Sequence, residues 1–448
     1  MADRLTLSVK KLFGSFDYEL SLVKGSSPLV ITAPNGYGKT TLLTILNNLR
    51  LGNLIYFWRL QFSEIHLKFG ENFNLCVKSL EGDISESSES IEDSEESNIE
   101  HSVVFEVEGQ PNTRLELSRS RLIEIIRQPS SIRFSEVILA VLDQENSLVA
   151  NTDLLLENYA EDILAALSKT QDSSLVLSLA SLPQVVYIKA DRLTRDKSEE
   201  LRFKHKIRGV NEISREEEIY AISQALESQL NIEYRKYLAI SQKSDKEFVN
   251  NLLHESEDIS KEDYELEVKA VEKKIKTLVG YGLVNKFTLP EYHEQKSFVL
   301  KAYLKDLNTN FASYDTIVRK LNLFIELINK KQMTRKTITV TRKSGLRAVS
   351  EDGSFLRLET LSSGEKNQII LLYDLIFCTP ANSVLLVDEP ELSLHVAWQM
   401  DYLEELEDIA KRNDLMVIVA THSPHIIGER WEQCYDLYEA TNDRDNNE

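Results

Sequence analysis

Two patterns of apolar and polar residues divide the chain into predicted strands and helices. Uninterrupted apolar runs at 384–387 and 416–420 are typical of strands buried on both faces, as in a parallel sheet. Asp388 and Glu389 follow the first run at once, and Pro390 cannot continue a central strand. The strand must therefore end where its two carboxylates begin. Since open α/β sheets bind ligands at the carboxyl ends of their strands, we expect both acids at a binding edge.

Alternation of apolar and polar residues predicts antiparallel strands near both ends of the chain. Residues 5–22 and 62–118 contain such strands, and 337–358 contains more of them around an Asp352-Gly353 hairpin turn. Between 197 and 331 the composition shifts to charged helix formers, with apolar residues at three- and four-residue steps. The heptad is not sustained there, so we expect a compact helical insertion rather than a long coiled coil.

These blocks predict one domain assembled from both ends of the chain. Its expected parts are 1–196 and 332–448, and the helical insertion of 197–331 separates them. Within the first part, residues 81–100 form a serine- and acid-rich run that is expected to be a solvated loop.

Composition and charge exclude several classes of protein. No apolar run reaches 18 residues and the amino terminus lacks a signal-peptide layout, so neither a membrane span nor a membrane partner is expected. Three cysteines, far apart and without metal-site spacing, fit a reducing cytoplasm. The net charge is −20, and because 81–100 holds nine acids and no base, the rest of the chain carries −11. This acidity argues against bulk attraction to nucleic acid but permits a local basic groove.

The segment Ala33–Thr41 has the composition and context of a phosphate-binding loop. It follows a predicted strand, 29–32, and precedes an apolar helix pattern. Glycines at 36 and 38 let backbone N–H groups approach phosphate oxygens, and the helix directs its positive end to the same place. Lys39 would reach the β- and γ-phosphates, while the Thr40 hydroxyl would bind Mg²⁺. The alternative is a glycine turn with an incidental Lys-Thr pair.

Three further residues would take part in metal binding and hydrolysis beside such a loop. Asp388 would hold Mg²⁺, directly or through water, and Glu389 would orient or deprotonate the attacking water. His422 follows the apolar run 416–420 and would contact the γ-phosphate. On its own, His422 would be interpreted as a hydrogen-bonded structural histidine.

A fourth segment, Leu361–Glu365, sets the class. Together with the segments above, in this order along the chain, it resembles the ABC-type ATPases, and among them the SMC, RecF and OLD-like branch. Ala33–Thr41 resembles the Walker A motif, Leu361–Glu365 the signature, and Val384–Glu389 the Walker B motif. Ser393–His395 resembles the D-loop, and Thr421-His422 the switch histidine. The resemblance implies an α/β fold, an ABC-ATPase head with a mixed core sheet, flanking helices and an antiparallel β subdomain.

The resemblance also implies ATP and Mg²⁺ as cofactors and a homo-oligomer that is at least dimeric. ATP would be sandwiched between two heads, with Ser362 and Gly364 of one copy donating to the γ-phosphate bound by the other. The residues expected to bind nucleotide within one copy are Asn35, Gly36, Gly38, Lys39, Thr40 and Thr41. This chain departs from the family at Ala33 and Ser363, where glycine is usual. The family's lid glutamine is not placed, with Gln128, Gln144 and Gln184 as candidates.

Two charged segments have open interpretations. Residues 319–347 hold nine bases and one acid, which fits either a nucleic-acid groove or a solvated helix and hairpin face. Ala190-Asp-Arg192 follows a predicted strand and would either face the nucleotide or form a structural salt bridge.

The predicted function is ATP binding and slow hydrolysis, coupled to the assembly or release of a partner. The chain ends about twenty-five residues after His422, so no carboxyl-terminal nuclease domain is expected, and no metal-nuclease constellation occurs elsewhere. An ATPase head of this size without a nuclease domain resembles the ATPase subunits of the PARIS and Septu anti-phage systems, and it is most similar to that of PARIS. We therefore expect a separately encoded nuclease or toxin effector and a phage protein as trigger. The alternative is a RecF- or SMC-like DNA repair or tethering ATPase, and a transporter ATPase is more distant.

Overall fold

The computed structural model describes residues 4–81, 101–110, 113–118, 173–189, 215–254, 257–330, 335–392, 394 and 396–445. The chain forms two compact units, each described by itself. The first comprises Met1–Leu193 and Thr379–Glu448, and the second comprises Thr194–Cys378. The expected insertion, 197–331, lies within the second unit, which also includes the segment up to Cys378. The predicted domain boundaries themselves remain a prediction.

A five-stranded parallel sheet forms the centre of the first unit. Its strand order is β14-β3-β13-β12-β8. The strands are β3 (Leu29–Thr32), β8 (Val185–Ile188), β12 (Val384–Asp388), β13 (Met416–Ala420) and β14 (Cys434–Asp436). All residues of β12 and β13 are buried, because the two apolar runs occupy the middle of a sheet that is covered on both faces.

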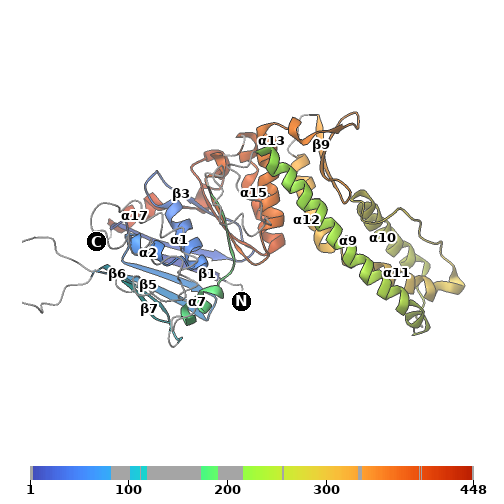
Figure 1. Ribbon diagram of the computed structural model, residues 1–448, viewed down its shortest axis with the longest axis horizontal. Helices are drawn as coiled ribbons and strands as arrows, with labels where there is room; N and C mark the ends of the chain where they lie inside the picture. The colour runs from blue at the N-terminus through green and yellow to red at the C-terminus, as the bar shows by residue number, and fades with distance from the viewer. Residues whose placement is uncertain are drawn as a thin grey trace, which may run out of the picture. The chain divides into compact units, whose positions relative to one another are not determined.

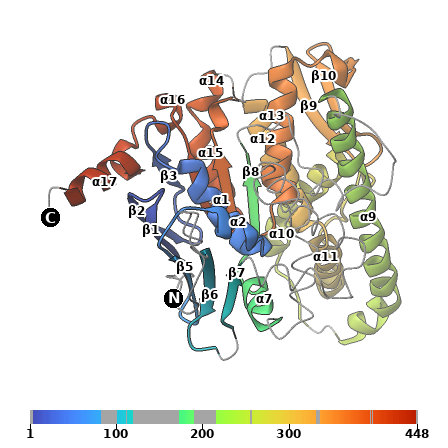
Figure 2. The ribbon, with the colours of Figure 1, turned by 60° about the vertical axis from the view of Figure 1, so that its left-hand side comes forward.

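The helices of the first unit connect and cover these strands. Helix α1 packs against β8, β12 and β13, which Figure 2 shows from the side of that helix. The helical segments are α1 (Lys39–Leu51), α2 (Ile55–Arg59), α7 (Ser173–Ala180), η5 (Pro390–Leu392), α14 (Val396–Gln399), α15 (Tyr402–Asn413), α16 (Pro424–Ile427), η6 (Trp431–Gln433) and α17 (Leu437–Asp445).

A six-stranded antiparallel sheet completes the first unit, in the order β2-β1-β4-β5-β6-β7 (Figure 1). The strands are β1 (Arg4–Leu12), β2 (Phe16–Val23), β4 (Glu64–Phe69), β5 (Phe73–Glu81), β6 (His101–Val107) and β7 (Leu115–Ser118). One cluster of buried apolar side chains joins both sheets with α1, α2 and α7. Since burial of one such side chain contributes about 2 kcal/mol, this cluster holds the two sheets together.

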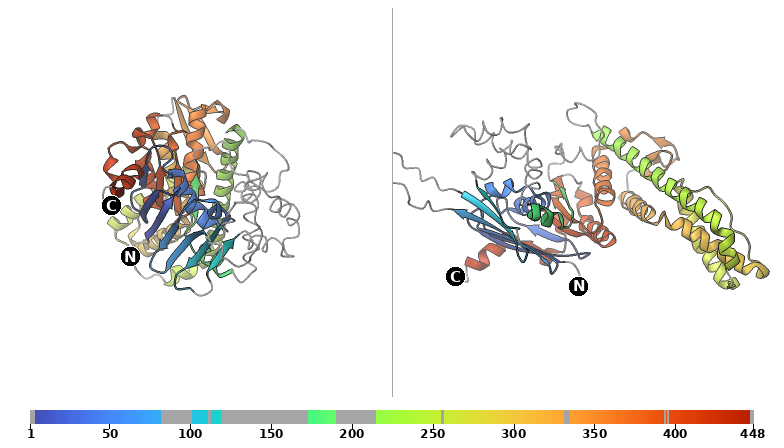
Figure 3. Two further views of the ribbon diagram at one scale, coloured as in Figure 1. Left: turned by 90° about the vertical axis from the view of Figure 1, so that its left-hand side faces the viewer. Right: turned by 60° about the horizontal axis from the view of Figure 1, so that its bottom comes forward.

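The second unit is largely helical. Figure 3 shows its long helix α9 (Arg215–His254), which packs along α11 (Ser297–Ala312). Its other helices are α10 (Lys261–Gly280), η2 (Glu294–Lys296), α12 (Asp315–Lys330), η3 (Leu358–Thr360), α13 (Ser363–Tyr373) and the π-helical turn η4 (Asp374–Cys378). A small antiparallel sheet, β11-β10-β9, consists of β9 (Lys336–Thr341), β10 (Gly345–Ser350) and β11 (Phe355–Leu356).

These elements confirm the predicted fold class, an α/β head with an antiparallel β part and added helices. The turn at Gly353 joins β10 to β11 as the Asp352-Gly353 pattern predicts, with φ of 82° at the glycine. After β12 the chain forms two separate helices, α14 and α15. The last residue of α14, Gln399, is buried and hydrogen-bonded to Leu394 O and to the Ser423 hydroxyl, so its side chain ties α14 to neighbouring loops.

Candidate active site

The loop between β3 and α1 has the backbone of a phosphate-binding loop. Gly36 and Gly38 have φ of 91° and 85°, backbone angles that residues other than glycine rarely adopt. A Cβ atom on Gly38 would lie 3.0 Å from Leu12 Cδ2. Helix α1 begins at Lys39 with no side-chain cap and no acid in its first turn. Its first N–H groups are therefore available to an anion, and Asn35 and Gly36 are exposed beside them.

Lys39 is buried and turned toward the loop that precedes it. Its Nζ donates to Ala33 O at 3.0 Å and lies 2.5 Å from His422 Nε2. Burial lowers the pKa of Lys39, and the nearby carboxylates of Glu389 and Asp388 oppose that shift. The lysine and the histidine, 383 positions apart, thus lie at one place.

Asp388, at the end of β12, accepts two hydrogen bonds on one carboxylate oxygen. The Thr40 hydroxyl donates to Oδ2 at 2.9 Å, and the Tyr187 hydroxyl donates to the same atom at 3.2 Å. The other oxygen, Oδ1, is buried and lacks a hydrogen-bond partner among the described residues. Burial raises the pKa of Asp388. An unpartnered buried carboxylate oxygen beside a threonine hydroxyl is a donor set that fits Mg²⁺.

Glu389 adopts an uncommon backbone conformation directly after the strand. Its φ is 43°, and its N–H donates to Ala420 O on β13 at 2.9 Å. The carboxylate is partly exposed, and its Oε1 lies 3.8 Å from His422 Nε2. Left-handed backbone at a residue other than glycine is concentrated at functional sites, where neighbouring contacts hold the strained turn.

Glu391 is a residue of this site that the sequence analysis did not single out. The Thr421 hydroxyl lies 2.9 Å from both of its carboxylate oxygens, and the backbone N–H of His422 donates to Oε1 at 2.7 Å. Glu391 therefore holds the backbone that carries His422. Glu391, the third acid of the segment after Asp388 and Glu389, was visible in the sequence, but its position gave no indication that Thr421 would be its partner.

Ser362 and Gly364 lie in the second unit, at the start of α13. Ser362 is the N-cap residue: its hydroxyl accepts from Glu365 N at 3.2 Å, while Glu365 Oε2 accepts from Ser362 N at 2.7 Å. The Glu365 carboxylate is nearly buried and pairs with Lys336 Nζ at 3.1 Å. The Ser362 hydroxyl keeps its own hydrogen for donation, and Gly364 adds no side chain beside it.

Several predicted residues lie outside the described part of the chain. These are Ser393 and His395 of the D-loop segment, Gln128, Gln144, Ala190–Arg192 and nearly all of the acidic run. Gln184 is described and is not a lid candidate. Its carbonyl accepts from Val384 N at the start of β12. The parallel register places Gln184 five residues, about 16 Å along the strand, from the level of Asp388.

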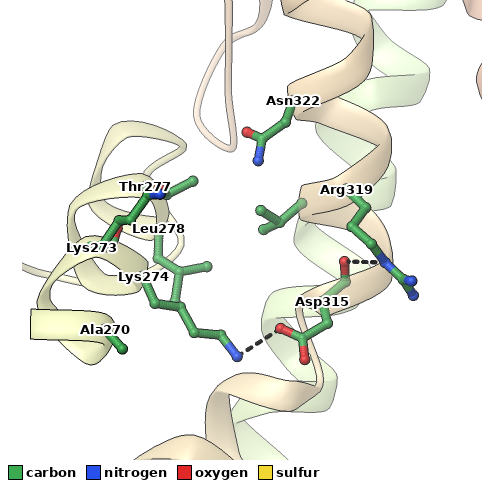
Figure 4. A pocket seen from close by; sticks show the side chains of 9 residues that line it. Ala270, Lys273, Lys274, Thr277, Leu278, Asp315, Arg319 and Asn322 are labelled. Atoms are coloured by element: carbon green, nitrogen blue, oxygen red, sulfur yellow. Dashed lines mark hydrogen bonds and ion pairs between the residues drawn. The ribbon is translucent and has the colours of Figure 1, made fainter. Parts of the chain in front are cut away.

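A pocket of about 530 Å³ between α10 and α12 of the second unit contains none of the predicted site residues (Figure 4). Lys274 pairs with the Asp315 carboxylate at 2.7 Å, and Arg319 Nε donates to Asp315 O at 3.2 Å. Asp315 thus holds two of the cationic side chains that line the pocket, Lys274 and Arg319.

A family model described as "AAA ATPase domain" matches residues 13–427. Two Helicobacter pylori proteins, each described as "Probable iron chelatin transport ATP-binding protein", are 26% identical over 166 residues, which is 36% of this chain and 58% of theirs. This chain thus matches little more than half the length of these curated relatives.

Two solved structures of Smc heads also align with the chain. A Pyrococcus furiosus Smc head with an extended coiled coil, bound to the C-terminal domain of ScpA, is 11% identical with a TM-score of 0.35, over 95% of this chain and 91% of that one. An Smc head bound to the C-winged helix domain of ScpA is 11% identical with a TM-score of 0.31, over 94% and 90%. Among the described residues, no helix combines the length and apolar character that crossing a membrane requires.

Proposed function

The chain belongs to the AAA ATPase domain family, and from this premise we propose that it is an ATPase that hydrolyses ATP slowly in a composite site between two copies of itself. One observation carries the proposal. At the carboxyl edge of the parallel sheet, Lys39 contacts His422 and Thr40 contacts Asp388, so three distant parts of the chain meet there. Such an edge is where α/β sheets bind ligands.

Within one copy, the loop before α1 holds the phosphates. Lys39 would exchange Ala33 O and His422 for the β- and γ-phosphates, which offer stronger, charged acceptors. Thr40 and Asp388 would hold Mg²⁺, which neutralises phosphate charge when it is bound. Oδ1 of Asp388, buried and unpartnered among the described residues, supports that assignment.

Glu389 and His422 would act on the γ-phosphate side. Glu389 accepts a proton from the attacking water or orients it, because its carboxylate is partly exposed just past the metal-binding aspartate. His422, released by Lys39, would donate to the γ-phosphate. Tyr187 holds Asp388 by its hydroxyl and so positions the metal ligand.

The second half of the site would come from another copy. There, Ser362 and Gly364 at the start of α13 would supply a hydroxyl and backbone donors to the same γ-phosphate. An exposed apolar strip next to the site supports such an interface. Leu392, Val396 and Met400 are spaced by four residues and are 67%, 53% and 69% exposed.

The cellular role that we propose is that of an ATPase subunit in an anti-phage defence complex of the PARIS type. ATP-driven oligomerisation would hold or release a separately encoded nuclease or toxin when a phage protein is sensed. The support is the resemblance of the ordered motifs at 33–41, 361–365 and 384–389 to the ATPase subunits of such systems. Co-expression with the adjacent genes tests this role, and a nuclease activity of the purified chain alone would contradict it.

The substitution Glu389→Gln tests the composite site. It should lower turnover by about a hundredfold or more while ATP binding persists, because it removes the proton acceptor but not the phosphate contacts. The variant should then accumulate as a closed oligomer with ATP and not with ADP, measured by light scattering after gel filtration. Glu429→Gln, outside the site, is the matched control. Turnover at the wild-type rate in Glu389→Gln would overturn the assignment of Glu389.

A further inference from the structure

A cluster of metal-ligating side chains lies on the antiparallel sheet of the first unit, apart from the ATPase site. Glu64 and His66 are two residues apart on β4, and Cys76 is the cross-strand partner of His66 on β5. All three point away from the face that buries Ile65 and Val77. One ligating atom from each lies within 4.8 Å of the others.

The separations of these atoms match the edges of a metal coordination sphere. His66 Nε2 lies 3.0 Å from Glu64 Oε1, and Cys76 Sγ lies 3.7 Å from that oxygen and 3.9 Å from the nitrogen. Two ligands of a tetrahedral zinc ion are about 3.3–3.6 Å apart. The nearest point equidistant from the three atoms lies in their plane, about 2.1 Å from each, and an ion slightly out of that plane would lie at zinc–ligand bond lengths.

From this geometry we propose that Glu64, His66 and Cys76 form a site for a tetrahedral transition-metal ion, of which Zn²⁺ fits best. A thiolate, an imidazole and a carboxylate form a mixed sulfur, nitrogen and oxygen ligand set. Such a set binds Zn²⁺ in preference to Mg²⁺ or Ca²⁺. The fourth position is open to water or to Glu106, the register partner of Cys76 on β6. Zinc there would cross-link β4 and β5.

Two lysines, Lys10 and Lys78, contact the Glu64 carboxylate and would compete with a metal ion for it or remain beside it. Lys10 Nζ contacts Glu64 Oε2 at 2.9 Å and not the ligating oxygen Oε1, so it can stay and orient the ligand. Lys78 Nζ contacts Oε1, the ligating atom, at 3.3 Å. Its side chain is 55% exposed, so it can swing into solvent when a metal binds. Lys78 is therefore a competitor, whereas Lys10 is a positioning residue.

Cobalt binding tests the site, because a thiolate ligand gives Co²⁺ a near-ultraviolet charge-transfer band that oxygen ligands do not give. Tag-free, full-length protein stripped with a chelator is titrated with Co²⁺ without nucleotide, and Zn²⁺ is then added. We expect one equivalent of Co²⁺ with this band, displaced by Zn²⁺. Absence of the band would overturn the proposal. Weak binding of many equivalents of Co²⁺ would also overturn it, because it would mark an adventitious ion only.

Variants assign the ligands. Cys76→Ser should abolish the band, and His66→Gln should weaken Zn²⁺ binding at least about tenfold, since even outer-shell changes cost that much. Cys434→Ser is the matched control and should keep both. Lys78→Met should tighten binding, because it removes the competing ammonium group. A band that persists in Cys76→Ser, or is lost in Cys434→Ser, contradicts the site.

A stability measurement separates metal loss from misfolding. Zn²⁺ should raise the melting temperature of the wild type and Cys434→Ser but not of Cys76→Ser, provided that all three melt alike without metal. If Cys76→Ser is already unstable without metal, Glu64→Gln and His66→Gln provide the same comparison. An equal zinc-induced rise in wild type and all three ligand variants would rule the cluster out as the binding site.

Discussion

Glu391 illustrates at the residue scale how one carboxylate organises the candidate active site. It accepts from the Thr421 hydroxyl and from the His422 backbone, while His422 Nε2 lies against Lys39 on the opposite side. A charge-assisted hydrogen bond to a carboxylate contributes about 1.5–3 kcal/mol, so loss of this anchor should release the loop after β13. Glu391 acts through His422 and is a positioning residue.

We predict that Glu391→Ala lowers kcat by about tenfold with little change in ATP affinity, because the phosphate-binding loop is untouched. Steady-state kinetics and a separate nucleotide-binding titration measure the two effects. Glu391→Gln, which keeps an acceptor oxygen, should restore much of the rate, and the exposed Glu432→Ala should behave like the wild type. An equal loss of ATP binding in Glu391→Ala would mean that the residue supports the fold instead.

At the element scale, the start of α13 combines a capping box with a partly buried ion pair. Ser362 and Glu365 exchange hydrogen bonds, and Lys336 on β9 neutralises the Glu365 carboxylate from the neighbouring strand. If this helix start meets a γ-phosphate of another copy, an uncompensated carboxylate there would repel it. Lys336 thus links β9 to the predicted signature.

Lys336→Met should therefore weaken ATP-dependent oligomerisation by about tenfold and leave nucleotide binding by the isolated copy unchanged. The double variant Lys336→Met with Glu365→Gln should recover, since the unpaired charge is gone. Lys343→Met, an exposed change near the same hairpin, is the control. Sedimentation with a non-hydrolysable ATP analogue measures the effect, and no recovery in the double variant would contradict the charge argument.

Helix α15 supplies a pH-dependent contribution to stability. Hydrogen bonds from Lys411, Ser27 and Arg430 lower the pKa of Glu407 to about 2. A depressed carboxyl pKa stabilises the fold above the unfolded pKa near 4.3, and this contribution is lost as the pH falls toward 2.

We expect Glu407→Gln to destabilise the protein by on the order of 1 kcal/mol at pH 7 and by progressively less below pH 4. Urea unfolding of both proteins across this pH range measures the difference. Glu404→Gln, in the first turn of the same helix, is the control. A difference that does not shrink at low pH would show that the effect is not electrostatic.

At the scale of the whole molecule, the distribution of charge bears on the choice between the two candidate roles. The chain carries −20, and several cations of the basic segment 319–347 have partners inside their own unit. Arg342 donates to Gly282 O and lies 4.0 Å from the Tyr234 ring centroid, and Lys320 lies over the Phe377 ring. These contacts favour a structural face over a nucleic-acid groove.

Duplex DNA should therefore bind weakly, with a salt dependence that corresponds to no more than about two phosphate contacts. Fluorescence anisotropy at several salt concentrations measures this slope. Tight, steeply salt-sensitive binding that stimulates hydrolysis would favour the DNA repair or tethering ATPase. Its loss on neutralising Arg335, Lys336, Arg342 and Lys343 would then locate the groove.

Local patterns by themselves determined the elements. Apolar runs predicted β12 and β13, and the glycines at 36 and 38 predicted the turn before α1, because these features depend only on neighbouring residues. Order along the chain then indicated an ATPase family, and the match to the AAA ATPase domain family confirms that class. The roles of individual site residues remain predictions, although the structure does bring Thr40 and Asp388 into contact.

Only the tertiary structure decided which side chains meet. Glu391 accepts a hydrogen bond from Thr421 because β12 and β13 are adjacent. Gln184 lies at the amino end of β8, away from the edge that holds Asp388, because β8 runs parallel to β12. Cys76 lacks metal-site spacing in the sequence, yet the register of β4 and β5 sets it beside His66. Strand order and register follow from long-range burial of apolar faces, and no local window of sequence contains that information.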